Sequence, residues 1–143
     1  MVLIFELITL VLFSIVCSLW DIKNKAVPVW LLIIGPVLIA IFKLIFLRPF
    51  EVWWLITAAG AGLFDFIVRL VTRGKLGIAD VLFGVFQGMV LSSQHLLLCI
   101  LIECGFAALD FFIIHKGTSG IPLPFIPFMA GGLLISYLIS FCY

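Results

Sequence analysis

The stretch Arg73-Gly74-Lys75-Leu76-Gly77-Ile78-Ala79-Asp80 separates two long apolar runs and ends in a carboxylate where the second run begins. A comparable carboxylate, Asp21, follows the first apolar run of the chain. Only 10% of the residues are charged, so an acidic side chain at the edge of an apolar run requires an explanation. Because both carboxylates lie at the edge of an apolar run, at equivalent depths, the sequence predicts that the two side chains act together.

The composition predicts a protein whose solvent is lipid. The chain has 143 residues, 66% of them hydrophobic, and its mean hydropathy is +1.44. A water-soluble domain of this size cannot bury so much apolar surface. The length favours a single membrane-embedded domain over residues 1–143. The formal net charge of +1 provides no basic surface for nucleic acid, so the expected partner is the lipid bilayer.

The apolar runs predict an all-α, polytopic membrane protein. A run of about 18 residues is long enough to cross the hydrocarbon core as a helix. We expect about six transmembrane helices and a polar first connection over residues 21–28. The first run lacks a basic start and a cleavage site, so it is expected to be retained. The expected helices cover residues 2–20, 29–47, 52–71, 80–91, 96–114 and 125–143.

The basic residues predict the orientation of these helices, because Lys and Arg are enriched in cytoplasmic loops. With a cytoplasmic first connection, the odd-numbered connections and their flanks contain six basic residues, and the other side has only Lys43 and Arg48. We therefore expect both termini outside and both Asp21 and Asp80 on the cytoplasmic side. The six basic residues are Lys23, Lys25, Arg69, Arg73, Lys75 and Lys116.

Taken singly, each aspartate has a structural explanation. Asp21 can be an interfacial anchor beside basic residues, and Asp80 can cap the N-terminus of a helix. Taken together, on one side and each beside a membrane span, they favour a functional pair. The nearby lysines Lys23, Lys25 and Lys75 can tune this pair electrostatically or can simply be solvated.

Paired carboxylates are suited to peptide-bond hydrolysis. Two carboxylates held close cannot both ionise easily, so they share a proton and titrate together. The ionised group takes a proton from water, and the neutral group hydrogen-bonds to the scissile carbonyl and later protonates the leaving nitrogen. We therefore predict an intramembrane aspartic peptidase with Asp21 and Asp80 as catalytic residues and with neither a metal nor another cofactor.

The remaining acidic residues are weaker candidates. Asp65 lies one helical turn before Arg69, which predicts an ion pair within one helix. Glu103 and Asp110 share a face of the fifth helix, and they either line a wet cavity or are satisfied within the bundle. Glu6 is expected at the outer interface.

Two other residue patterns bear on packing and on metal binding. Gly84 and Gly88 have the GxxxG spacing, which indicates close helix packing or is coincidental. None of the four cysteines forms a CxxC pair, so the spacing does not favour a metal site. Their apolar surroundings predict buried free thiols. The cysteines are Cys17, Cys99, Cys104 and Cys142.

Three segments resemble motifs of the type IV prepilin peptidases. Residues 21–28 (DIKNKAVP) look like the first aspartate motif of that family, in which basic residues and a hydrophobic–proline step follow the aspartate. Gly77-Ile78-Ala79-Asp80 resembles the GxGD motif. Residues 121–132 (IPLPFIPFMAGG) are similar to the family's late segment of the type IPFGPFLALG. The three segments occur in the family's order.

This resemblance implies a GxGD-type aspartic peptidase of the cytoplasmic (inner) membrane. Such an enzyme removes short basic leader peptides from prepilin-like precursors at the cytoplasmic face, and Asp21 and Asp80 match its catalytic aspartates. The chain lacks the cysteine-bearing domain of the longer members, so we expect a minimal peptidase without methyltransferase activity. Supporting or substrate-binding roles are expected for Gly77, Ala79, Lys23, Lys75, Pro122, Pro124 and Pro127.

The chain departs from the family pattern at two positions. Ala79 replaces the second motif glycine, which would strain the backbone if that position had a positive φ. The lysine that commonly follows the motif is absent from Asp80-Val81-Leu82-Phe83. Two alternatives therefore stand beside the enzyme. One is an inactive relative that serves as an assembly subunit of a pilus or secretion system, and the other is a small proton-coupled transporter using Asp65, Glu103 and Asp110.

Overall fold

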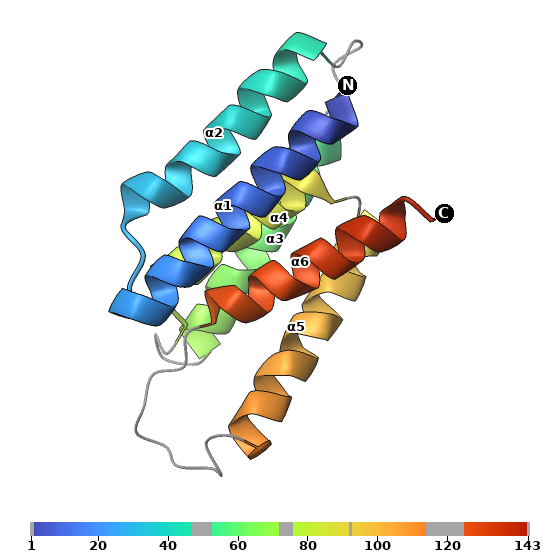
Figure 1. Ribbon diagram of the computed structural model, residues 1–143. Coiled ribbons are helices and arrows are strands. Elements are labelled where there is room, and N and C mark those ends of the chain that lie inside the picture. Colours follow the sequence, from blue (N-terminus) through green and yellow to red (C-terminus); the bar gives the residue numbers. More distant parts are fainter. Residues whose placement is uncertain (1, 47–52, 72–75, 92, 114–124, 143) are drawn as a thin grey trace.

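The computed structural model describes residues 2–46, 53–71, 76–91, 93–113 and 125–142. These residues form six α-helices and no strand, which confirms the all-α prediction. Consecutive helices run in opposite directions (Figure 1). The helices are α1 (Val2–Asn24), α2 (Val29–Phe46), α3 (Trp53–Val71), α4 (Ile78–Val90), α5 (Ser93–Ile113) and α6 (Ile126–Ser140).

The alternating directions bring four helix ends together. The C-terminal ends of α1 and α3 and the N-terminal ends of α4 and α6 lie toward the lower left in Figure 1. We call this region the aspartate end, because Asp21 lies near the end of α1 and Asp80 near the start of α4. The expectation that both aspartates lie on one side of the bundle agrees with this arrangement.

The exterior of the bundle is that of a membrane protein. Stretches of α1, α2 and α3 are long and apolar enough to cross a membrane, and α4, α5 and α6 contain shorter apolar stretches. Large apolar side chains such as Leu12, Trp30 and Leu63 point outward from the first three helices. Lipid is the solvent that such a surface requires. The number of crossings and the side on which the termini lie stay predictions.

The end of α1 differs from the sequence prediction. We expected the first helix to end at Trp20, but α1 continues to Asn24, so Asp21 lies inside a helix and not in a loop. The Lys25 N–H donates to the Asp21 carbonyl oxygen at 2.7 Å, and Lys25 has a φ of 52°. A residue in the left-handed region commonly ends a helix. The polar side chains that follow Trp20 therefore mark where the chain leaves its apolar surroundings. The helix itself continues for another turn.

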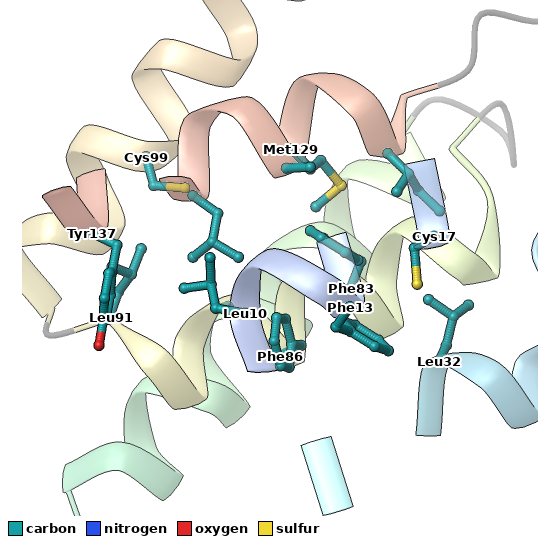
Figure 2. Packing of buried hydrophobic residues seen from close by; sticks show 14 of the residues in the cluster. Leu10, Phe13, Cys17, Leu32, Phe83, Phe86, Leu91, Cys99, Met129 and Tyr137 are labelled. Atoms are coloured by element: carbon teal, nitrogen blue, oxygen red, sulfur yellow. The ribbon is translucent and has the colours of Figure 1, made fainter. Parts of the chain in front are cut away.

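Aromatic side chains join α1 to α4 in the core. The ring of Phe13 lies 4.5 Å from that of Phe86 and 6.0 Å from that of Phe83, measured between ring centroids. All three side chains are buried among aliphatic residues of α1 and residues of α6 such as Met129 (Figure 2). This cluster fixes the two helices that carry Asp21 and Asp80 relative to each other.

The packing of α3 on α4 uses the GxxxG glycines, which confirms specific packing. A β-carbon at Gly88 would lie 2.6 Å from the Ala58 Cα and closer still to the Thr57 carbonyl oxygen. A β-carbon at Gly84 would overlap the Asp65 carboxylate. The Thr57 hydroxyl donates to the Gly88 carbonyl oxygen at 2.6 Å, so the close approach also creates a hydrogen bond.

A buried ion pair lies at the end of the bundle away from the aspartates. The Lys43 ammonium is 3.6 Å from the Glu6 carboxylate and donates to the Met89 carbonyl oxygen at 2.6 Å. The Tyr137 hydroxyl also donates to Glu6, at 3.5 Å. Glu6 is only 7% exposed and Lys43 only 9%, so Glu6 points into the bundle, and its depth relative to the membrane interface stays a prediction. Burial of the acid is possible here because the bundle supplies it with a cation.

Breaking this ion pair is expected to destabilise the fold. Lys43→Met leaves the Glu6 carboxylate buried without its cation, which lowers the free energy of unfolding by about 3 kcal/mol. Adding Glu6→Gln to that variant removes the uncompensated charge and restores part of the loss. Unfolding in detergent micelles measures both changes. A double variant at least as unstable as Lys43→Met alone contradicts this account.

The four free cysteines differ in burial. Cys17 and Cys99 are buried free thiols, as predicted, and Cys104 and Cys142 are exposed. The prediction is wrong for the second pair because an apolar sequence context in a membrane protein does not distinguish a core-facing from an outward-facing side chain.

Candidate active site

Asp21 is held where α1 meets the start of α6. Its side chain lies in the last turn of α1 and is 7% exposed. Its Oδ2 accepts a hydrogen bond from the Ile126 N–H at 3.2 Å. Ile126 is the first residue of α6, and the first N–H groups of a helix have no partner within the helix. Two helices far apart in the sequence thus combine to orient one carboxylate.

Asp80 is held by the turn that precedes α4. It is the third residue of that helix and is 8% exposed. Its Oδ2 accepts a hydrogen bond from the Gly77 N–H at 2.8 Å. Gly77 is extended, with φ −70° and ψ 157°, and occupies the N-cap position. The capping explanation for Asp80 therefore holds locally, and it fixes the position of a buried carboxylate.

The aspartate end concentrates charge in apolar surroundings. Asp21 and Asp80 lie close enough for the charge of one to act on the other. Asp65 and Arg69 of α3 also interact electrostatically with Asp80. Among the described residues, Asp65 and Arg69 thus lie near Asp80 where α3 packs on α4, and Asp21 lies at the same end of the bundle. Two carboxyl groups that are held close together share a proton and can activate a water molecule.

The predicted supporting residues fall in different places. Gly77 contacts Asp80 directly, and Ala79 is the half-buried second residue of α4. Pro127 is the half-buried second residue of α6, beside the amide that contacts Asp21. Lys23 is exposed. Three further predicted residues lie outside the described part of the chain: Lys75, Pro122 and Pro124.

The backbone at Ala79 is compatible with alanine. Ala79 is helical, and among the described non-glycine residues only Lys25 has a positive φ. The strain that a left-handed conformation would cause is therefore absent at this position. The replacement of the second motif glycine does not distort the start of α4.

A second buried polar cluster was not predicted. The Gln87 amide donates to the Glu103 carboxylate and to the Met129 carbonyl oxygen, the latter at 3.1 Å. The Cys99 thiol donates to Glu103 at 2.9 Å. Glu103 is thus satisfied between α4, α5 and α6, which favours the bundle alternative over a wet cavity. The side chain of Asp110 lies outside the described residues.

The contacts of Asp65 and Arg69 extend beyond the predicted ion pair. Asp65 lies against Gly84 of α4, and Arg69 Nη1 donates to the Leu76 carbonyl oxygen. The ion pair between them stays a prediction. One sequence does not reveal these contacts, because each depends on how α3 packs against α4 and its preceding turn.

Comparison with known protein families gives a match over most of the chain. A family model described as the type IV leader peptidase family matches residues 8–113, a range that includes Asp21 and Asp80 and more than half of the chain. A search of curated proteins and a search of solved structures gave no match.

Proposed function

Because the chain belongs to the type IV leader peptidase family, we propose that it is an intramembrane aspartic endopeptidase. It removes short basic leaders from prepilin-like precursors at the cytoplasmic face of the cytoplasmic membrane. Membership of the family supports peptidase activity. The observation that supports the aspartic mechanism is that two buried carboxyl groups, Asp21 and Asp80, lie at the same end of the bundle on helices distant in the sequence.

In the proposed reaction, one carboxylate of the pair takes a proton from a water molecule. The water oxygen then attacks the scissile carbonyl carbon while the neutral carboxyl group hydrogen-bonds to the carbonyl oxygen. A proton passes to the leaving nitrogen as the C–N bond breaks. The products are a leader with a new carboxylate and a mature chain with a new amino group. The Ile126 and Gly77 amides hold the two carboxyl groups in place for these steps.

The charge at the aspartate end supports a basic leader as substrate. Asp21, Asp65 and Asp80 are buried or half-buried carboxyl groups there, whereas Lys23 and Lys25 at the end of α1 are exposed to solvent. A basic peptide complements such a site electrostatically. The apolar exterior of α1 to α3 supports a precursor that reaches the site with its own hydrophobic helix in the bilayer. The distribution of Lys and Arg supports a cytoplasmic site.

The helical conformation of Ala79 supports an active enzyme over an inactive relative. We expect Ala79→Gly to leave leader removal unchanged within about twofold and to lower the free energy of unfolding by up to about 1 kcal/mol, because glycine is a poorer helix former. Cleavage rates and unfolding in detergent, measured on the same preparations, test both effects. A large gain in activity would mean that alanine impairs the site.

Co-expression with an epitope-tagged prepilin-like precursor tests the proposed function. We expect a shift of the precursor to the size of the mature chain on a gel, and mass spectrometry of the product should identify a cut at the end of the basic leader. An established prepilin peptidase serves as the positive control for the precursor. Failure of this chain to process several precursors that the control cleaves would refute the proposal.

A further inference from the structure

One peptide group connects Arg69 to Asp80. Arg69 Nη1 donates to the carbonyl oxygen of Leu76. The N–H of Gly77 donates to Asp80 Oδ2 at 2.8 Å. The Leu76 carbonyl and the Gly77 N–H belong to the same planar amide, in which the two groups point in opposite directions when the bond is trans. The guanidinium therefore lies on one side of this peptide group and the carboxyl group on the other.

The position of Arg69 suits this connection. Arg69 lies in the last turn of α3, and Asp80 lies in the first turn of α4. Arg69, Leu76 and Gly77 are all half-buried, so water competes only partly for their hydrogen bonds. The charge of Arg69 also acts directly on Asp80. One side chain thus fixes the turn that precedes Asp80 and adds a positive charge near it.

A charged donor strengthens this connection. Hydrogen bonds from a guanidinium are stronger than those between neutral groups. A donor at a carbonyl oxygen polarises the amide, which makes its N–H a better donor in turn. The bond from Gly77 to Asp80 is therefore tighter with Arg69 in place than without it.

We propose that Arg69 is a positioning residue for Asp80 and acts through the Leu76–Gly77 peptide group. This inference rests on the proposed catalytic role of Asp80. In the proposed reaction, Arg69 contacts neither the attacking water molecule nor the scissile bond. It contributes by orienting the Asp80 carboxyl group. Among the described residues, the charged groups that act on Asp80 are Asp21 on α1 and Asp65 and Arg69 on α3.

Steady-state cleavage of a precursor by the purified full chain in detergent tests the inference. We expect Arg69→Met to lower kcat about tenfold or more and to change KM less than about twofold, because misorientation of a catalytic group impairs the reacting state more than substrate binding. Arg69→Lys keeps the charge and one donor, so it should recover a substantial part of kcat. Lys25→Asn is the charge control for the hydrogen–deuterium exchange measurement below. It removes a positive charge from an exposed residue near the same end, and asparagine tolerates the positive φ at that position.

Hydrogen–deuterium exchange provides a measurement that does not need activity. The Gly77 amide should exchange about tenfold faster in Arg69→Met than in the unmodified protein, and Lys25→Asn should leave its exchange unchanged. Unchanged exchange in Arg69→Met overturns the inference. So does an unchanged kcat when the unmodified protein cleaves the precursor. If the unmodified protein does not cleave any precursor, the proposed function fails, and the exchange data still decide whether Arg69 holds Gly77.

Discussion

Replacing Asp80 by asparagine is expected to slow leader removal roughly 1,000-fold, and Asp21→Asn should have a similar effect. An amide cannot take a proton from water or donate one as a carboxyl group does. Its oxygen can still accept a hydrogen bond, so the Asp80→Asn variant should keep the bond from the Gly77 N–H, which is 2.8 Å long in the unmodified protein. Both variants should therefore remain folded. A time course of precursor cleavage, with unfolding in detergent measured in parallel, separates loss of chemistry from loss of structure.

Glu103→Gln is the matched control for these variants. It also converts a buried carboxyl group to an amide, but Glu103 lies in the cluster with Gln87 and Cys99 and not in the aspartate pair. We expect it to retain leader removal within about tenfold of the unmodified rate. The transporter alternative instead predicts that Glu103→Gln or Asp110→Asn is the change that abolishes the protein's activity. If the Asp80→Asn variant cleaves the precursor at the rate of the unmodified protein, the proposed mechanism is wrong.

The second large effect is expected from Gly88→Ala, which should lower the free energy of unfolding by about 3 kcal/mol. The added methyl group would meet backbone atoms of Thr57 and Ala58, and the 2.6 Å distance to the Ala58 Cα is too short for a carbon contact. Backbone cannot rotate away as a long side chain can, so α3 and α4 must separate. The hydrogen bond from Thr57 to the Gly88 carbonyl oxygen weakens as they do.

Gly60→Ala is the control for this prediction. Gly60 lies inside α3, and a β-carbon there would have no neighbour within 4 Å among the described residues. Both substitutions replace a helical glycine by alanine and gain up to about 1 kcal/mol of helix propensity, so their difference isolates the steric overlap. Thermal unfolding midpoints in the same detergent compare them. Equal midpoints would mean that the close approach of α3 and α4 is not required for the fold.

The sequence was sufficient to predict the helices and the placement of both aspartates at one end of the bundle. Runs of about 18 apolar residues predict most of the helices from hydropathy. The short fourth run also needed the distribution of Lys and Arg between the connections. The alternating direction of consecutive spans then places the end of α1 and the start of α4 together. The exact end of α1 was wrong because a helix can continue through polar residues. Asp21 consequently lies in a helical turn, where the Lys25 N–H bonds to its carbonyl oxygen.

The contacts that hold the aspartates could not be predicted from one sequence. The bond from Ile126 to Asp21 joins residues at opposite ends of the chain, and the bond from Arg69 to Leu76 depends on how α3 ends beside α4. The ion pair of Glu6 and Lys43 was missed for the same reason. Hydropathy identifies which segments enter the membrane but carries no information about which polar groups meet inside the bundle. The effect of Ala79 likewise depended on its φ, which residue identity does not determine.

The Asp21→Asn/Asp80→Asn double variant provides the most direct test of the claim that the two aspartates act as one catalytic pair. Its rate of leader removal should be compared with that of each single variant on the same precursor, with a mass-spectrometric readout sensitive enough for residual cleavage. Residues that act as a unit show strongly non-additive effects. The double variant should therefore be no more than about threefold slower than either single variant. The opposite result is appreciable residual activity in both single variants and a loss in the double variant that equals the product of the two single losses. That result would contradict the claim that the two aspartates act as one catalytic pair.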